Sequence, residues 1–530
     1  MNENVEQWCV SKPALVSAAG AVAAQHWLAA RAGAAVLHDG GNAIDAAVAT
    51  AFALGVVEPW MSGIGGAGYM VAWLAAEERA VALDFQGMLP AAIRLDDYPL
   101  DPDVPPSLMG FPGVRENRNV EGYLSILVPG AVAGLAQASA RFGKLGLDRA
   151  MAPSLALAER GLPVDWHATL MIALEARKLA RDPAARAWLL PGGLPPTPEQ
   201  WLFNPALLET YRAIAAEGPE VVYGGRIGAA MAADLAAGGA RITLDDFRAY
   251  TVAEFDAPAI RHRGHDVHTA GATSGGPRLA DALGHVAAHL DTSAGVGADA
   301  WATYAEALDL AFRRHEERLG RSSPPTGCTS HLSTVDAAGN MVALTFTLLN
   351  RFGAGVVLPR TGVLMNNSVS YFDPRPGRPT TMRGQLKINA SNMCPTVAVE
   401  NGAARFAVGA SGADHIVPCT FQLVSLMLDF GLDLETAFHT PRIDAADRGR
   451  VRVDPRMGDA AIAELGRRFE LEVAQRLVFP KLYASPTGVA RDPASGRCTA
   501  IADVASPIAG TATAGPFVAP PAAKAPQARA

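Results

Sequence analysis

The 530-residue chain is poor in cysteine, and none of its cysteines stands in a spacing that would bind a metal. The five are Cys9, Cys328, Cys394, Cys419 and Cys498. An odd, scattered set without a CxxC pair argues against a disulfide framework and suits a reducing compartment. We therefore expect no metal, no other cofactor and a cytoplasmic location.

The sequence also lacks a long hydrophobic run, a signal peptide and a basic stripe. The best apolar stretch, Ala46 to Val57, stops at Glu58 and is too short to span a bilayer. The first residues, Met1 to Gln7, carry acidic side chains where a signal peptide needs positive ones. The net charge of -7 argues against nucleic-acid binding. We expect neither a membrane nor a nucleic acid as partner.

What the sequence does contain is a Gly-Cys-Thr-Ser stretch, Gly327 to Ser330, behind a segment rich in proline and serine. A cut before Thr329 would give its hydroxyl a base, because a free α-amine has a pKa of roughly 7.7 to 8. The same hydroxyl could first attack the carbonyl of Cys328, so that an acyl shift and hydrolysis release that amine. Cys328 and Thr329 are thus a candidate autocleavage site.

Two predicted hairpins surround this junction. Residues 329–336 and 341–347 alternate like strands around an Asp-Ala-Ala-Gly-Asn turn, which would bring Thr329 and Thr347 to the same end. Thr347 could then hydrogen-bond to the nucleophile. A second hairpin, with an Asn401-Gly402 turn, leads into the small residues 409–413. Backbone N–H groups in such a loop can converge on an oxyanion.

The remaining pattern is mixed helix and strand. We expect a helix from about Ala21 to His38, and a second helix capped by Asn42 with Asp45 at its third position. Further expected elements are paired strands at 69–74 and 80–85, a mostly helical region at 130–246 and a helix at 301–319. The low-complexity residues 509–530 are expected to be a disordered tail.

Several phrases occur in an order that resembles the γ-glutamyltranspeptidase family of N-terminal-nucleophile hydrolases, from about Val16 to about Asp503. They are Gly40 to Val48, Gly55 to Pro59, Ser62 to Gly66, Thr329 to Ser333, Asn366-Asn367, Ser391 to Thr396 and Gly409 to Ala413. Each phrase alone is weak evidence, and their order makes the resemblance specific.

The resemblance implies an α/β (α+β) fold, a four-layer αββα sandwich formed jointly by two autocleaved subunits. Residues 1–328 would be the large subunit and 329–530 the small one, in one interlocked unit. Thr329 would be the nucleophile with its amine as base, Thr347 would contact its hydroxyl, and Gly412 and Ala413 would form the oxyanion hole. A homo-oligomer of such heterodimers is compatible with the sequence.

The chain departs from the family where the substrate head group is held. Gln86 stands in place of the arginine that clamps the α-carboxylate, and a neutral amide cannot replace that ionic clamp. Tyr371 replaces the acidic residue that meets the α-amino group. The expected substrate-binding residues are Gln86, Asn350, Arg351, Tyr371, Ser391 and Asn392. Arg351, Arg383, Lys387 and His415 are candidates to bind a substrate carboxylate, and His331 is expected to be structural.

We therefore expect an amidohydrolase for a small, non-γ-glutamyl amide. Relatives with such pockets include acylases of β-lactam side chains and an oxamate amidohydrolase. One alternative is a γ-glutamyltransferase or glutathione hydrolase with a rebuilt pocket, and another is an uncleaved, non-catalytic binding relative. The glycine-rich residues 62–68 precede a strand instead of following one, which argues against a dinucleotide-binding fold.

Overall fold

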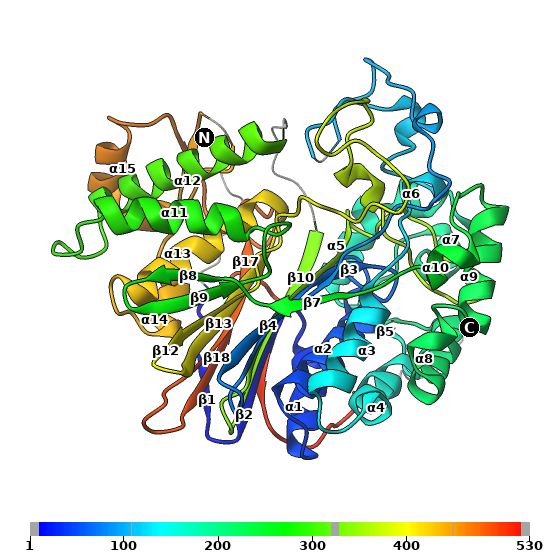
Figure 1. Cartoon of the computed structure of the whole chain (residues 1–530), viewed down its shortest axis with the longest axis horizontal. Coiled ribbons are helices and arrows are strands. Elements are labelled where there is room, and N and C mark those ends of the chain that lie inside the picture. Colours follow the sequence, from blue (N-terminus) through cyan, green and yellow to red (C-terminus); the bar gives the residue numbers. More distant parts are fainter. Residues whose placement is uncertain (1–9, 108, 320–327, 448, 521–530) are drawn as a thin grey trace, which may run out of the picture.

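The computed structural model describes residues 10–107, 109–319, 328–447 and 449–520. Two seven-stranded antiparallel sheets lie face to face between two layers of helices (Figure 1). In order across the first sheet, the strands are β19 (Gly510–Thr513), β2 (Gly20–Ala24), β10 (Cys328–Asp336), β11 (Met341–Leu349), β3 (Ala67–Leu74), β4 (Arg79–Phe85) and β7 (Ala253–Asp256). The second sheet runs β1 (Leu15–Ser17), β18 (Cys498–Ala502), β17 (Ser485–Arg491), β13 (Ala403–Ser411), β12 (Thr396–Glu400), β9 (His265–Thr269) and β8 (Ala259–His262).

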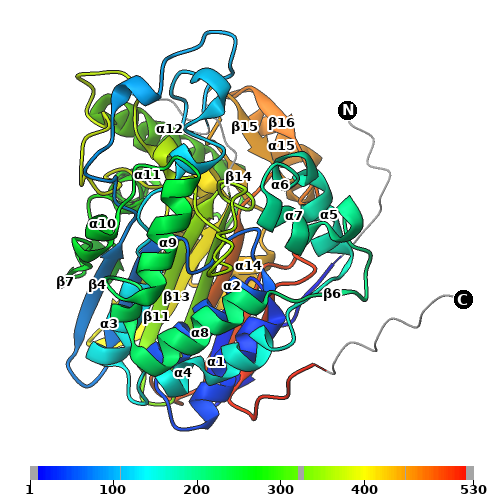
Figure 2. The same ribbon diagram turned by 90° about the vertical axis from the view of Figure 1, so that its right-hand side faces the viewer.

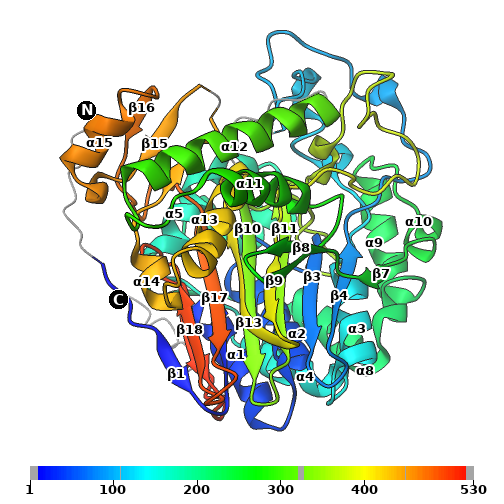
Figure 3. The same cartoon turned by 60° about the vertical axis from the view of Figure 1, so that its left-hand side comes forward.

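Helices cover both outer faces. The first sheet is covered by α1 (Trp27–His38), α2 (Ala43–Val57), α3 (Ala131–Phe142) and α4 (Leu147–Ala158), with α8 (Pro205–Glu217), α9 (Arg226–Ala237) and α10 (Leu244–Arg248) beyond them (Figure 2). On the second sheet lie α11 (Gly276–His289), α13 (Ile416–Leu428) and α14 (Leu434–His439), and α12 (Ala298–Leu319) packs on α11 (Figure 3). Smaller elements at the periphery are α5 (Trp166–Leu174), α6 (Ala176–Leu179), α7 (Pro183–Leu189), α15 (Asp459–Leu465), β5 (Leu162–Pro163), β6 (Trp201–Leu202), β14 (Ile443–Asp444), β15 (Val451–Val453) and β16 (Leu471–Val473).

The predicted four-layer αββα sandwich is confirmed. Both sheets also combine strands from before and after the Cys328–Thr329 bond. The first sheet takes β2, β3, β4 and β7 from residues before it and β10, β11 and β19 from residues after it. Because each sheet is built from strands of both parts, neither part can bury its apolar faces without the other.

Helix α2 packs against one face of β10. Its fifteen residues are all buried, since it lies between the first sheet and the helices α1 and α4. Asn42 accepts hydrogen bonds from the backbone N–H groups of Ile44 and Asp45, and the Asp45 carboxylate bonds back to the N–H of Asn42. This is the capping box expected from the sequence, and it fixes where the helix begins.

The side chains of β10 alternate between two environments. Thr334 points to the helical layer, where its hydroxyl donates to the carbonyl of Ala43 at 2.7 Å. His331 points to the second sheet, and its ring lies so close to Gly409 of β13 that a Cβ there would be 2.4 Å from it. The strand is therefore fixed in register between two packed surfaces, which also fixes its first residues.

Two expectations are wrong. Residues 20–24 form the strand β2, paired with β10 and β19, because this alanine-rich run is buried within a sheet where packing overrides helix propensity. Residues 510–513 of the expected disordered tail form β19 on the edge of β2. Alternating Thr and Ala fit a half-buried edge, and Ala512 packs into the core. Residues 521–530 lie outside the described residues.

Candidate active site

Thr329 lies at a β-bulge between β10 and β11. The register runs from Cys328 opposite Leu349 to Ser330 opposite Phe346, so Thr347 and Leu348 both face Thr329. Bulges locally bend a strand and redirect its side chains. The predicted hairpin is present, and it brings Thr329 and Thr347 to the same end as expected.

The hydroxyl of Thr347 donates a hydrogen bond to the carbonyl oxygen of Cys328, and it accepts one from the N–H of Leu349 at 2.8 Å. We expected Thr347 to contact the hydroxyl of Thr329. The hydrogen bond instead reaches the carbonyl of the peptide bond between Cys328 and Thr329. A donor at this oxygen polarises the carbonyl carbon that the Thr329 hydroxyl would attack.

The loop after β13 carries two residues with left-handed backbone angles. Gly412 has φ +134° and Ala413 has φ +50°, and a Cβ on Gly412 would lie 3.1 Å from Cα of Ala484. Directly afterwards a 3-10 turn, Ala413–His415, leads into α13. The N–H groups of Gly412 and Ala413 thus stand at the start of a helical segment, where the backbone dipoles favour a negative charge.

A small cavity of about 10 Å³ adjoins Thr329, which is 4% exposed. Its walls are Met109, Cys328, Thr329, Leu349, Tyr371, Asn392, Met393, Ala413 and Ile416. No Lys, Arg, Asp or Glu is among the described residues of this wall. The cavity is therefore narrow and mostly apolar, and Tyr371 and Asn392 supply its polar side chains beside the threonine.

Asn392 is positioned by a buried arginine that sequence reasoning missed. Arg278 of α11, 1% exposed, donates to Oδ1 of Asn392 at 2.8 Å and to the carbonyl of Ser391 at 3.0 Å. Its other nitrogen is 3.4 Å from Asp414, which follows Ala413. One guanidinium thereby ties the 391–392 segment to the loop of Gly412. The amide Nδ2 of Asn392 has no partner among the described residues, so this donor is available at the cavity wall.

A second, larger cavity of about 500 Å³ lies on the other side of Cys328. Its wall includes residues of α5, α6, the segments 105–107, 117–121 and 478–483, and the loop of Gly412. Asn350 and Arg351 line it, and Arg351 lies 3.6 Å from Glu175. Four buried polar atoms of this wall lack hydrogen-bond partners among the described residues: Ser107 Oγ, His167 Nδ1, Asn350 Oδ1 and Ser411 Oγ. Such atoms can bond to water or to a polar molecule in the cavity.

His415 also lines the large cavity. Burial disfavours its charged form, but the carboxylate of Asp444, 2.9 Å from Nδ1, outweighs this effect and raises the pKa of the imidazole. His331 behaves differently, because burial lowers the pKa of its ring to about 3. Its nitrogens contact the hydroxyls of Thr345 at 2.7 Å and Ser333 at 3.1 Å. His331 is thus a neutral, structural residue, as expected.

The structure does not bring every predicted site residue to Thr329. Gln86 and Ser391 are fully buried and line neither cavity, and both amide atoms of Gln86 lack partners among the described residues. Arg383 is exposed, and the Lys387 ammonium donates to the carbonyl of Thr251. Within the described residues, no group of His, Cys, Asp or Glu side chains could hold a metal ion, and no helix is long and apolar enough to cross a bilayer.

Several known proteins are similar to this chain in sequence and in fold. The gamma-glutamyltranspeptidase family model matches residues 29–325 and 315–509. The acylase ACY 1 proenzyme of Pseudomonas sp. (strain V22) is 35% identical over 473 residues, covering 82% of this chain and 84% of that protein. Glutathione hydrolase 3 of Arabidopsis thaliana is 30% identical over 458 residues, covering 76% of this chain and 69% of that protein.

Among solved structures, cephalosporin acylase from Bacillus halodurans superposes with a TM-score of 0.84 at 24% identity, covering 97% of this chain and 99% of that one. The two proteins therefore have the same fold over almost the whole of this chain. The family itself is shown by the family model and by the 35% identical relative. The chain belongs to the γ-glutamyltranspeptidase family and is an enzyme of the N-terminal-nucleophile hydrolase type.

Proposed function

We propose that the chain cuts itself between Cys328 and Thr329 and then hydrolyses a small amide through an ester on the Thr329 hydroxyl. The observation that carries this proposal is the hydrogen bond from Thr347 to the Cys328 carbonyl at the bulge. A donor at this oxygen would polarise the carbonyl of one particular peptide bond, the one directly before Thr329.

In the first step, Oγ of Thr329 attacks the carbonyl carbon of Cys328 and the C–N bond breaks. The carbonyl group moves to Oγ as an ester, and the nitrogen becomes a free amine. Water then hydrolyses the ester, which leaves a carboxylate on Cys328 and frees the hydroxyl. The donor on the Cys328 carbonyl stabilises the negative charge that develops on its oxygen.

In the catalytic cycle, the α-amine of Thr329 takes the proton of its own hydroxyl as Oγ attacks the substrate carbonyl. The N–H groups of Gly412 and Ala413 stabilise the oxyanion. The leaving amine takes a proton as the C–N bond breaks, and water hydrolyses the acyl ester. Each step uses groups of this chain and needs no cofactor.

The acyl group is proposed to be short and not a γ-glutamyl group. The small cavity beside Thr329, at about 10 Å³, has room for about one water molecule, so it can admit only the end of an acyl group, and it carries no charged side chain among its described residues. A free amino-acid head group would leave its carboxylate and ammonium unpaired there, which costs several kcal/mol per ion. The donor Nδ2 of Asn392 suits a carbonyl or carboxamide oxygen on a short acyl group.

The test is a screen of the purified, cleaved enzyme against oxamate, short acyl amides, glutaryl amides and a γ-glutamyl anilide. We expect turnover of a short or non-γ-glutamyl amide, lost in Thr329→Ala. Rapid turnover of the γ-glutamyl anilide would instead support the glutathione hydrolase alternative. An uncleaved chain without any amidase activity would support the binding-protein alternative.

A further inference from the structure

The large cavity contains a carboxylate that the proposed reaction does not use. Glu58, directly after α2, is 3% exposed and lines this cavity. One of its oxygens accepts a hydrogen bond from the hydroxyl of Ser330 at 2.8 Å, and that hydroxyl also receives one from Ser62 at 2.8 Å. The second oxygen of Glu58 has no hydrogen-bond partner among the described residues, so it is available on the cavity side.

Other acidic groups of the cavity wall already have cations. Glu175 is 3.0 Å from Lys178 and 3.6 Å from Arg351, and Glu121 pairs with Arg181. Glu58 has no ion pair with any described residue, although Lys481 lines the same cavity. A buried carboxylate without a cation is costly when ionised, and a positively charged ligand would remove that cost.

We propose that the large cavity holds the amine half of the substrate and that Glu58 binds an ammonium group carried on that half. This inference rests on the proposed function, which places the short acyl group in the small cavity. Cys328 lines both cavities, so its release by cleavage would join them at Thr329. The larger cavity then has room for the amine half.

Two further acceptors of the wall suit an ammonium group, which has three hydrogen-bond donors. Asn350 Oδ1 is an unpartnered acceptor, and so is His167 Nδ1 when the proton is on the other ring nitrogen. Burial lowers the pKa of His167 to about 3, so its ring is neutral and does not repel a cation. Trp60 also lines this cavity.

The charge of Glu58 should make the affinity for a cation depend on pH. Burial raises the pKa of Glu58 to about 7, against the smaller lowering effects of Ser330 and Lys481. A cation binds the ionised carboxylate, so its affinity should rise by about tenfold from pH 6 to pH 8. The other charged side chains that line this cavity are Lys178, Arg351, Lys481, Glu121 and Glu175. His415 loses its proton as pH rises, so Glu58→Gln is needed to separate the two effects.

The first experiment measures binding to the full, cleaved protein by calorimetry, with 1,4-diaminobutane as probe and 1,4-butanediol as its neutral counterpart. We expect the diamine to bind at least tenfold more tightly than the diol, and the preference to disappear in Glu58→Gln. Glu121→Gln, which removes a carboxylate already paired with Arg181, should change the preference by less than twofold. Equal binding of both probes, or an unchanged preference in Glu58→Gln, would overturn the inference.

The second experiment compares hydrolysis of N-acetyl-1,4-diaminobutane and N-butylacetamide, which differ only in the ammonium group of the amine half. We expect kcat/KM to favour the cationic amide at least tenfold in the wild type and not in Glu58→Gln. Hydrolysis without this preference overturns the Glu58 site and leaves the amidase proposal standing. Diamine binding without hydrolysis of any amide overturns the amidase proposal and leaves the Glu58 site standing. If Glu58→Gln fails to fold or cleave, Glu58→Asp and the wild-type pH series decide the question.

Discussion

At the scale of single residues, the carbonyl of the Cys328–Thr329 bond accepts a hydrogen bond from Thr347 on the adjacent strand. Cleavage at this junction was expected from the sequence, because the attack needs a threonine and the carbonyl before it, and it stays a prediction. The hydrogen-bond partner of Thr347 could not be predicted, since the bulge shifts the register by one residue between Cys328 and Ser330. A hydroxyl predicted to touch the nucleophile therefore reaches the carbonyl of the preceding residue.

This contact predicts that Thr347→Val slows self-cleavage by about a hundredfold, because loss of one donor to a developing oxyanion costs on that order. The measurement is the time course of precursor conversion on a denaturing gel after synthesis in a cell-free system. Thr345→Val, two residues away on β11, is the control, because its hydroxyl contacts His331 and not the scissile carbonyl. Equal cleavage rates in both variants would exclude a role for the Thr347 hydroxyl.

The substrate residues show a similar limit of sequence reasoning. Tyr371 and Asn392 do line the cavity of Thr329, whereas Gln86 and Ser391 are buried away from both cavities. Position in a motif indicates which loop a residue belongs to, but the direction of its side chain depends on packing with distant elements. Glu58 had one sequence signal, as the first charge after the apolar residues 46–57, and that signal carried no function by itself.

At the scale of elements, turn chemistry was the most reliable guide. The Asn401-Gly402 turn between β12 and β13 was predictable, and both residues have positive φ, 50° and 74°, as a two-residue hairpin turn requires. The strand β2 was missed because alanine favours helices in isolation and only the neighbouring strands make an extended conformation favourable.

The loop between β13 and α13 makes a prediction of its own. Gly412→Ala should lower activity by about a hundredfold, because a side chain is strained at φ +134° by roughly 1–3 kcal/mol and would press on Ala484, displacing the N–H groups. Amide hydrolysis and thermal unfolding of the cleaved variant are the measurements. Gly402→Ala, with φ +74° in the β12–β13 turn, should cost comparable stability while full activity per folded molecule remains. A Gly412→Ala enzyme as active as Gly402→Ala would refute the oxyanion-hole assignment.

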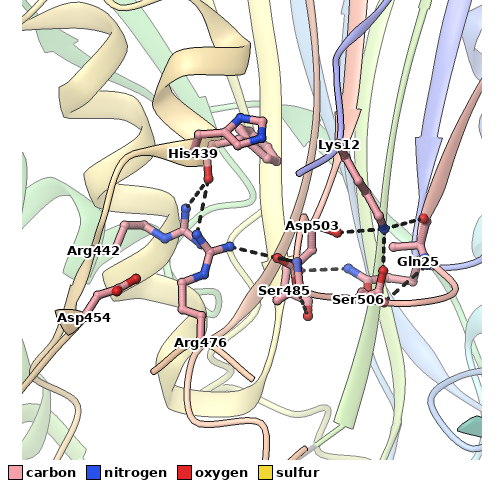
Figure 4. A network of polar contacts seen from close by, with 12 residues as sticks. Lys12, Gln25, His439, Arg442, Asp454, Arg476, Ser485, Asp503 and Ser506 are labelled. Carbon is pink, nitrogen blue, oxygen red and sulfur yellow. Dashed lines mark hydrogen bonds and ion pairs between the residues drawn. The ribbon is translucent and has the colours of Figure 1, made fainter. Parts of the chain in front are cut away.

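At the scale of the whole molecule, contacts across the two predicted subunits hold the sandwich together. Near the N-terminus, the ammonium of Lys12 donates to the carbonyls of Asp503 at 3.0 Å, Ala509 at 2.9 Å and Ser506 (Figure 4). Gln25 of the same part donates to the carbonyl of Ser485 at 2.8 Å. The acceptors all follow Thr329 in the chain, so these bonds would join the subunits after cleavage.

The network is extended by Asp503, which accepts hydrogen bonds from Arg476 at 2.9 Å and from the Ser485 hydroxyl at 2.6 Å. No local sequence pattern predicts the contacts of Lys12, because they connect residues almost five hundred positions apart. They depend on the mixed strand order of the two sheets, which the sequence indicated only through the family resemblance.

Lys12→Met should therefore lower the free energy of unfolding of the cleaved protein by about 2 kcal/mol, because buried carbonyls lose their donor. The subunits should also separate at lower urea concentration, as followed by size-exclusion chromatography. Lys144→Met is the control, since this lysine is exposed and its side chain makes no hydrogen bond or ion pair with a described residue. Identical urea profiles for the two variants would contradict the proposed role of Lys12.

The most direct test of the central claim is the intact mass of the purified chains under denaturing conditions. For the wild type we expect two chains whose masses match residues 1–328 and 329–530, with Thr329 as the new N-terminus, and for Thr329→Ala a single uncut chain. Thr329→Ser should cleave in part, because a serine hydroxyl can perform the same attack. A single intact wild-type chain, a cut at another bond, or efficient cleavage of Thr329→Ala would contradict the account.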